Sequence, residues 1–209
     1  MSSEQRHRRW RLLIGKLNKE RKRQAKKIDI LCKDLIAAQR DFIKRLETIS
    51  FTANFYESII ATNDLSKLLY TAGRLIKQEV ADVNVTFFLR QADTFELHMF
   101  ESDRPITLEK HRLENCFTAE LVENICKSNR LCSLDDMFAM GLQGNLFGLS
   151  KISAVTIPLS DLGQSLGFIL IYRSSQDTLT ADELNRISAV TRGLSRAIQA
   201  HVVPVQATD

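Results

Sequence analysis

The sequence contains no run of about 18 apolar residues, so no helix is expected to cross a membrane. Residues 1–9 also lack the apolar segment and the small-residue cleavage site of a secretory signal, which predicts a cytoplasmic protein. Four cysteines in 209 residues are too few for a disulfide scaffold, and in a reducing compartment they are expected to be thiols. The ordinary balance of 44% hydrophobic and 26% charged residues indicates a globular protein, long enough for one domain and an extension.

Acidic residues are scarce at the start of the chain, although the net charge is only +4. Residues 1–33 hold 12 Lys and Arg against 3 Asp and Glu, whereas residues 34–209 hold 17 against 22. Such a segment fits three alternatives: a solvated helix end, attraction to an anionic membrane or acidic partner, or attraction to nucleic acid. The base-reading pattern of bZIP proteins is missing from it. The basic arm comprises Arg8, Arg9, Arg11, Lys16, Arg21, Lys22, Arg23, Lys26 and Lys27.

A long helix is predicted over residues 1–60, because His7 to Ile60 contains no proline and only one glycine, Gly15. Apolar residues recur there with the seven-residue period of a coiled coil. An isolated helix with such a seam is marginal in water, so it needs either a second copy of the chain or its own domain as a partner. A parallel homodimer is the favoured alternative. The dimer seam comprises Ile28, Leu31, Leu35, Phe42 and Ile49.

Helix and strand patterns follow one another in the rest of the chain. Apolar residues at helical spacing over Leu65–Val80, after the capping residue Asp64, predict a helix. The β-branched and aromatic stretch Val83–Gln91 and the alternating stretch Phe95–Glu101 predict a hairpin. The polar stretch Ser102–Glu114 is expected to be a loop.

A helix capped by Thr118 and a short strand at Arg130–Leu134 are expected next. Residues 151–199 then read strand, turn, strand and capped helix. Thr180 and Glu183 have the spacing of a capping box, which predicts the start of the last helix.

This order of elements, with a few residues at particular places, resembles the GAF domain family. The resemblance covers Ala61 to Ala200 and rests on the helix and strand at 65–90, on the segment 116–137 (CFTAEL, then RLCSLDDM), on Ile157-Pro158-Leu159 ending one strand, and on Gly167 in the next. Gly167 also has a physical reason, since glycine allows a bulge or a close backbone approach within a strand.

The resemblance implies an α+β fold with a GAF-like antiparallel sheet, helices packed on one face of it, and a long N-terminal helix before it. The chain is therefore divided into a basic N-terminal helix or coiled coil at 1–60, a GAF-like domain at 61–201 and a flexible tail at 202–209.

In GAF domains a ligand, where present, binds on the other face of the sheet, under loops that correspond to Ser102–Phe117 and Asp135–Lys151. The second loop is rich in apolar residues and glycine, so it is either a lid over a small ligand or a segment that completes the core. The candidate pocket or lid residues are Phe88, His98, Cys116, Cys132, Asp135, Met137, Met140, Phe147 and Thr156.

Known chemistries of the family do not match the sequence. The cyclic-nucleotide signature is absent after Tyr172-Arg173, and Glu183 is better explained as a capping residue. Cys116 is followed by Phe117 and not by the histidine common at bilin attachment sites. No convergent set of His or Cys suggests a metal. No cofactor and no metal are therefore expected.

One enzyme alternative remains, because Cys116 to Ala119 resembles the Cys-Gly-Thr-Ala motif of free methionine-R-sulfoxide reductases. The catalytic cysteine of those enzymes would fall within Phe147 to Ser150, where this chain has no thiol. The sequence thus predicts a non-catalytic, cytoplasmic regulatory or sensor protein of bacterial type. It is expected to be a homodimer with an unknown downstream partner and a possible small-molecule ligand; the alternatives are the thiol enzyme and an adaptor whose basic helix binds nucleic acid or an anionic membrane.

Overall fold

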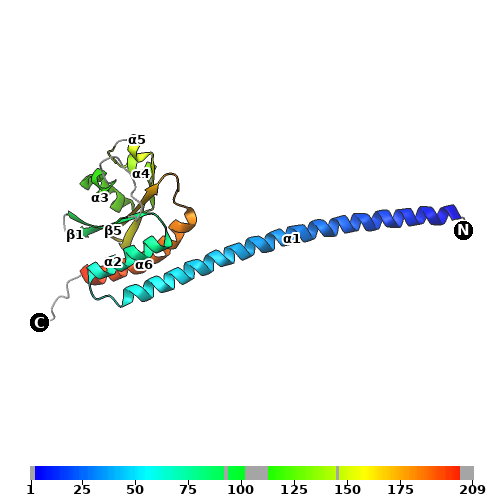
Figure 1. Cartoon of the computed structure of the whole chain (residues 1–209), viewed down its shortest axis with the longest axis horizontal. Coiled ribbons are helices and arrows are strands. Elements are labelled where there is room, and N and C mark those ends of the chain that lie inside the picture. Colours follow the sequence, from blue (N-terminus) through cyan, green and yellow to red (C-terminus); the bar gives the residue numbers. More distant parts are fainter. Residues whose placement is uncertain (1–2, 92–93, 102–112, 145, 203–209) are drawn as a thin grey trace. The chain divides into compact units, whose positions relative to one another are not determined.

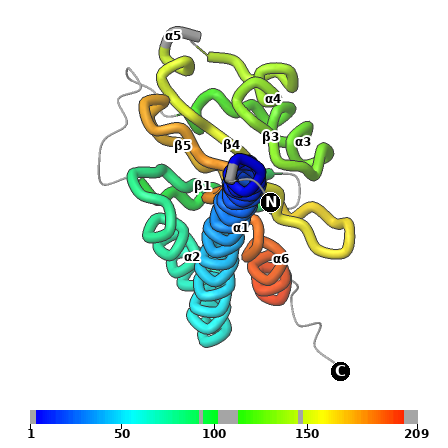
Figure 2. Tube along the Cα trace, turned by 90° about the vertical axis from the view of Figure 1, so that its right-hand side faces the viewer, coloured from blue at the N-terminus to red at the C-terminus, as the bar shows by residue number. Residues whose placement is uncertain are grey.

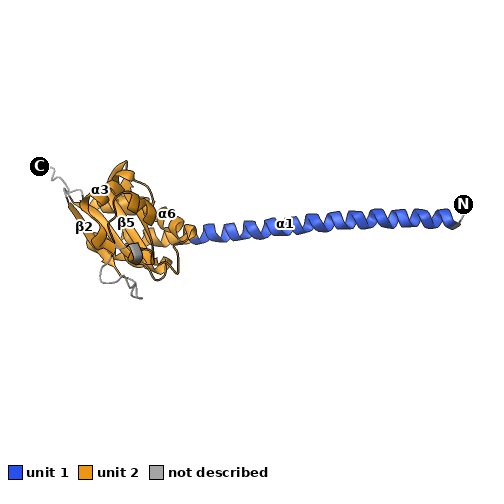
Figure 3. Cartoon of the chain, turned by 90° about the horizontal axis from the view of Figure 1, so that it is seen from above, with its two compact units in different colours: residues 1–47 blue, residues 48–209 orange. Residues whose placement is uncertain are grey.

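The computed structural model of the protein describes residues 3–91, 94–101, 113–144 and 146–202. The chain forms two compact units, residues 1–47 and residues 48–209 (Figure 3). Within the described residues, none of the helices combines the length and the apolar character needed to cross a membrane. Of the predicted tail at 202–209, Val202 ends the last helix, and residues 203–209 lie outside the described residues.

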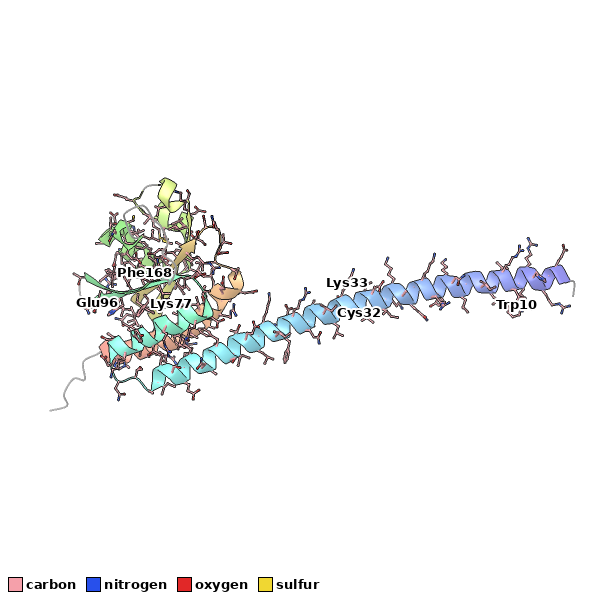
Figure 4. All side chains as sticks on the ribbon, viewed as in Figure 1. Trp10, Cys32, Lys33, Lys77, Glu96 and Phe168 are labelled. Atoms are coloured by element: carbon pink, nitrogen blue, oxygen red, sulfur yellow. The ribbon has the colours of Figure 1, made fainter. Side chains whose placement is uncertain are left out.

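The described part of the first unit is entirely helical. Helix α1 runs from Ser3 to Ile60 without a break, which confirms the predicted long helix. Every residue from Glu4 to Glu47 is exposed, including the apolar side chains of the predicted dimer seam. Figure 4 shows Trp10 and Cys32 projecting from this helix.

The second unit begins at Thr48, whereas the sequence placed the start of the domain at residue 61. The reason lies in the last part of α1, where Phe51, Phe55 and Ile59 are buried in the core of the second unit. Apolar residues at helical spacing are compatible with both a coiled coil and an internal core, so the pattern alone could not show where burial in the domain begins.

A five-stranded antiparallel sheet forms the centre of the second unit, and its strands follow the order β2-β1-β5-β4-β3. The predicted hairpin is confirmed, since β1 and β2 pair from Val85–Phe100 to Gln91–Thr94. The predicted strand at 130–134 contributes only two residues. The strands are β1 Asn84–Gln91, β2 Thr94–Phe100, β3 Cys132–Ser133, β4 Ile152–Asp161 and β5 Gln164–Ser174.

Three helical segments cover one face of the sheet, which we call the α6 face. Helices α2 (Leu65–Glu79) and α6 (Ala181–Val202) lie against the strands, and the last part of α1 packs on these two helices (Figures 1 and 2). Gly193 of α6 permits this approach, because a Cβ there would lie 2.2 Å from the Tyr56 ring. The Tyr56 hydroxyl donates to the carbonyl of Ala189 at 3.2 Å.

The opposite face, which we call the α3 face, is also covered. A second core forms here beneath shorter helices, most of which are too short to show a helical period in the sequence. They are the 3₁₀ helix η1 Leu113–Cys116, α3 Ala119–Ser128, α4 Leu134–Ala139 and α5 Leu146–Leu149.

Gly167 allows strands β1 and β5 to lie close together. Its φ of +135° suits glycine, and a Cβ there would lie 1.8 Å from the carbonyl oxygen of Phe88. The close backbone approach expected from the sequence is therefore confirmed. It keeps the register in which Phe88 pairs with Phe168.

The buried guanidinium of Arg173 joins three segments at the end of β5. It forms a two-armed ion pair with Glu183, at 3.1 Å (Nη1 to Oε1) and 2.9 Å (Nη2 to Oε2). It also donates to the carbonyls of Ala81, Asp177 and Thr178. The α2–β1 connection and the β5–α6 connection are thereby tied to the start of α6.

The capping box predicted at the start of α6 is confirmed. The Glu183 carboxylate accepts from the Thr180 N–H at 2.7 Å, and the Thr180 hydroxyl accepts from the Glu183 N–H at 3.3 Å. Burial opposes ionisation of Glu183, but the bonds from Thr180 and the Arg173 ion pair outweigh it and lower the pKa of that carboxyl. Glu183 therefore stabilises the fold in its charged form.

We expect the substitution Glu183→Gln to lower the free energy of unfolding at neutral pH by about 2–3 kcal/mol, because it leaves the Arg173 charge without a carboxylate. The pKa of Glu183 is lower in the folded state, so its contribution is complete above the ordinary pKa of 4.5 and disappears as the pH falls through the folded value. Urea unfolding at several pH values should show the variant and the parent converging in acid. The exposed carboxyl of Glu57 supplies the control, since Glu57→Gln should change neither the free energy of unfolding nor its pH dependence. If Glu183→Gln still lowers the free energy of unfolding in acid, the effect does not come from the charge of Glu183.

Candidate functional site

The α3 face of the sheet carries an aromatic cluster at its centre. Phe88 of β1 and Phe168 of β5 are buried and stack with ring centroids 4.6 Å apart and planes inclined by 17°. Phe117, which follows η1, lies over both rings at 5.1 and 6.1 Å. Figure 4 shows Phe168 inside the unit. The cluster forms an apolar floor between the sheet and the segment after η1.

A buried carboxylate lies beside this floor. Glu114 of η1 is 7% exposed, and its two oxygens accept hydrogen bonds from Thr86 at 2.5 Å and from Tyr172 at 3.0 Å. Both donors stand on the α3 face, one on β1 and the other on β5. Burying an acid is costly unless it is hydrogen-bonded, so the two hydroxyl groups make the position of Glu114 possible.

Sequence reasoning missed Glu114, because it lies at the end of a polar stretch that was expected to be loop. A signal was present in Thr86 and Tyr172, whose hydroxyl groups interrupt two otherwise apolar strands. A polar side chain that is forced to face a core requires a partner from another element.

Cys116 ends the same 3₁₀ helix and is half-buried. Burial raises the pKa of its thiol, and the nearby Glu114 carboxylate raises that pKa further. Burial likewise raises the pKa of Cys126, and Glu123 adds to this effect, while Ser165 and Arg90 oppose it. A nucleophilic cysteine requires a lowered pKa, so these surroundings disfavour thiolate chemistry at either residue.

Two further groups of the predicted site lie on β3 and β4. The thiol of Cys132 donates to the Arg130 carbonyl at 3.4 Å and lies 3.4 Å from the Ser128 hydroxyl. Thr156, which is opposite Cys132 in the sheet, is fully buried, and its hydroxyl has no hydrogen-bond partner among the residues that the structure describes. An unpaired buried hydroxyl is rare and marks a polar point on an otherwise apolar wall.

The structure places six of the nine predicted pocket residues in the core of the α3 face or against it. Met137 and Cys132 are completely buried there, and Met140 is half-buried at its rim. The six are Phe88, Cys116, Cys132, Met137, Met140 and Thr156. Asp135 is exposed on α4, and the side chain of Phe147 lies outside the described residues.

The prediction for His98 was wrong about its face. His98 pairs with Phe87, and paired residues point to the same side of a sheet, so it lies on the α6 face. Its Nε2 is 3.2 Å from Glu96 Oε1, which is an ion-pair distance, but the geometry is not that of a hydrogen bond. Sequence reasoning could not fix the direction of His98, because the apolar and polar residues of β2 alternate at a sheet edge where both faces are partly exposed.

The segment 135–151 contributes to the core of the α3 face, as the core-packing alternative expected. Met137, Leu142 and Leu149 of this segment are buried in it. Helix α4 begins with a capping box between Ser133 and Asp136, whose bonds from Ser133 lower the pKa of the Asp136 carboxyl.

A separate groove of about 370 Å³ opens at the outer side of β4. It exists because β3 pairs only with Val155 and Thr156, which leaves the remainder of β4 without that neighbour. Sequence reasoning did not predict it, since the two-residue length of β3 was not apparent. Its walls are formed by Asn129, Pro158, Ser160, Asp161, Leu162, Thr191 and Arg192.

The described part of the chain holds no group of three or more His, Cys, Asp and Glu side chains arranged to bind a metal ion. The α3 face presents stacked aromatic rings, a few hydroxyl groups and one carboxylate.

Comparison with solved structures identifies the fold. The GAF domain of a phosphoenolpyruvate-protein phosphotransferase (ptsP) from Coxiella burnetii has a TM-score of 0.54 at 10% identity, over 74% of this chain and 94% of that one. The GAF domain of the cyanobacteriochrome TePixJ has a TM-score of 0.51 at 16% identity, over 67% and 92% of the two chains. Residues 122 to 287 of a methyl-accepting chemotaxis protein have a TM-score of 0.51 at 13% identity, over 70% and 95%.

These likenesses confirm the GAF fold that the sequence suggested, together with its α+β class and antiparallel sheet. No protein-family sequence model matches the chain. The search of curated protein sequences gives no match either.

We expect Cys116 to be alkylated by iodoacetamide at neutral pH at least about tenfold more slowly than the exposed Cys32, because burial and Glu114 disfavour its thiolate. Glu114→Gln should raise the rate at Cys116, since it removes the nearby negative charge. Mass spectrometry of each cysteine measures both rates.

The matched control is Glu123→Gln, which removes a charge near Cys126 and should leave the rate at Cys116 unchanged. If Cys116 reacts faster than Cys32, its thiol pKa is not raised in solution, and the thiol-enzyme alternative is restored.

Proposed function

We propose that the protein is a non-catalytic, cytoplasmic regulatory protein, in which a GAF domain responds to a small ligand or a partner and changes the state of a dimeric coiled coil. The observation that carries the proposal is that helix α1 belongs to both units. Its first part carries an exposed apolar seam, and its last part is buried in the domain core.

The exposed seam supports dimerisation. Leu31, Leu35 and Phe42 are each more than 60% exposed, and they repeat at the a and d positions of a heptad. Burying one such side chain contributes about 1.5–3 kcal/mol, so a seam of five residues provides a substantial driving force for pairing with a second copy.

A series of contacts leads from the α3 face to α1. Strands β4 and β5 carry Thr156 and Tyr172 on the α3 face, and α6 packs on the other side of β4. Helix α6 in turn holds Tyr56 of α1 through the space left by Gly193. A shift of β4 and β5 would therefore move α6 and, through its contact with Tyr56, displace the last part of α1.

The solved domains with this fold come from a phosphotransferase, a cyanobacteriochrome and a chemotaxis protein. The fold thus serves as a module in proteins of different kinds, which favours a regulatory role over one particular reaction. The raised thiol pKa values of Cys116 and Cys126 also favour a protein without thiol catalysis.

The double substitution Leu35→Asp/Phe42→Asp should convert the dimer to a monomer, because it places two charges in the seam. Size-exclusion chromatography with light scattering measures the mass. Ile36→Asp/Ile43→Asp is the matched control, since these exposed residues have the same spacing but lie one position outside the seam. A parent protein that is monomeric, or a control that dissociates equally, would reject the seam.

A ligand of the α3 face should raise the melting temperature of the parent protein. Saturation to about 100 times the dissociation constant stabilises by about 2.7 kcal/mol, which corresponds to a shift of several degrees. Tyr172→Phe should weaken that shift, because it frees one oxygen of Glu114 and alters the site. A metabolite panel that moves no transition, with the α3 face filled by its own side chains, would favour a structural adaptor without a ligand.

A further inference from the structure

The beginning of helix α1 has a second apolar surface, apart from the seam at 28–49. Trp10, Leu13, Ile14 and Leu17 are 54–65% exposed, and their spacing of three and four residues places them on one side of the helix. We call these four residues the Trp10 face.

Positive charge surrounds the Trp10 face. Between Glu4 and Lys27 the helix carries 11 Lys and Arg against 2 Glu, and all of these residues are exposed. Counted at 100° per residue, Arg8, Arg11, Lys16 and Lys22 fall on the flanks of the apolar stripe or opposite it. Arg6 and Arg21 stand on the apolar side at its two ends, and Leu12, which is 66% exposed, lies on the opposite side. Between those ends the helix is amphipathic, with one narrow apolar side and a predominantly basic remainder.

This segment is poorly suited to extend the coiled coil. The heptad positions that follow Leu17 are occupied by Arg21 and Gln24, which interrupt the seam. A parallel pair would also bring two segments of net charge +9 side by side, and like charges at this density repel. An anionic partner would remove that repulsion.

We propose that residues 3–27 bind an anionic lipid surface, with the Trp10 face inserted among the headgroups and the basic residues against the lipid phosphates. Positive charge alone is compatible with both an anionic lipid surface and nucleic acid, and the Trp10 face favours the lipid surface. Nucleic acid phosphates are recognised by the basic residues without an apolar stripe, whereas a helix in a membrane interface requires one. The proposal goes beyond the regulatory function and does not depend on a ligand at the α3 face.

The chain contains a built-in reporter, because Trp10 is its only tryptophan. The full-length protein is mixed with vesicles of phosphatidylcholine alone or with added phosphatidylglycerol. We expect co-sedimentation and a blue shift of Trp10 emission only with the anionic vesicles, and weaker binding as the salt concentration rises. Brominated lipids should quench Trp10 if its ring enters the bilayer.

Two sets of variants separate the apolar and the electrostatic contributions. Leu13→Gln/Leu17→Gln, which keeps good helix formers, should weaken vesicle binding about tenfold to a hundredfold. Neutralising Arg8, Arg9, Arg11 and Lys16 with glutamine should weaken it about a hundredfold to a thousandfold. Arg8→Lys/Arg9→Lys/Arg11→Lys keeps the charge and should bind as the parent does.

Ile36→Gln/Ile43→Gln is the control for apolar loss elsewhere on the same helix and should bind vesicles normally. The monomeric seam variant should still bind, although less tightly, because it presents one basic segment and not two. Failure of the dimer is thus distinguishable from failure of the membrane proposal.

Circular dichroism of each variant should show unchanged helix content, so that a loss of binding is not a loss of folding. Absence of vesicle binding by the parent, or binding without a change in Trp10 emission, would overturn the proposal. Binding of duplex DNA in place of vesicles, undiminished in Leu13→Gln/Leu17→Gln, would assign the segment to nucleic acid.

Discussion

The arrangement of the second unit depends on the buried pairing of Arg173 with Glu183. Arg173 is the penultimate residue of the central strand β5, and Glu183 lies in the first turn of α6, the helix that packs across the sheet and supports the last part of α1. The carbonyls of Ala81, Asp177 and Thr178 take up the other donors of the guanidinium. The Arg173 side chain thereby holds the start of α6 beside the end of β5. Its charge is largely buried, so it requires these hydrogen-bond and ion-pair partners.

The two faces of the sheet differ in how many polar groups they bury. The α6 face is mainly apolar, with His98 and the buried Ser195 of α6 as polar exceptions. It is closed by helix packing, in which Gly73 and Gly193 let Phe100 and Tyr56 approach closely. The α3 face combines stacked phenylalanine rings with Glu114, Thr86, Tyr172 and the unpaired hydroxyl of Thr156. Buried polar groups are costly unless they are hydrogen-bonded, and the bonds from Thr86 and Tyr172 to Glu114 hold η1 against this face of the sheet.

Much of the fold could be predicted from the sequence, because its longest elements have clear periods and clear ends. The alternation and β-branched residues of β1 and β2, and the Thr180–Glu183 capping box, each identified an element correctly. What could not be predicted depends on contacts between distant residues. The burial of Phe51 and Phe55, the direction of His98 and the role of Glu114 all follow from which element lies opposite, and local patterns do not contain that information. Six of the nine candidate residues met on one face because the resemblance to GAF domains had already indicated the face and the loops to consider.

Pro158 has a consequence for how the molecule associates. It lies in the part of β4 that extends beyond its short pairing with β3, where a row of free backbone groups would otherwise invite another strand. Proline has no N–H to offer, so the ladder cannot be continued regularly at that point. Edge-to-edge pairing of this sheet with another strand is thereby hindered along this border, which protects an exposed strand edge from templating aggregation.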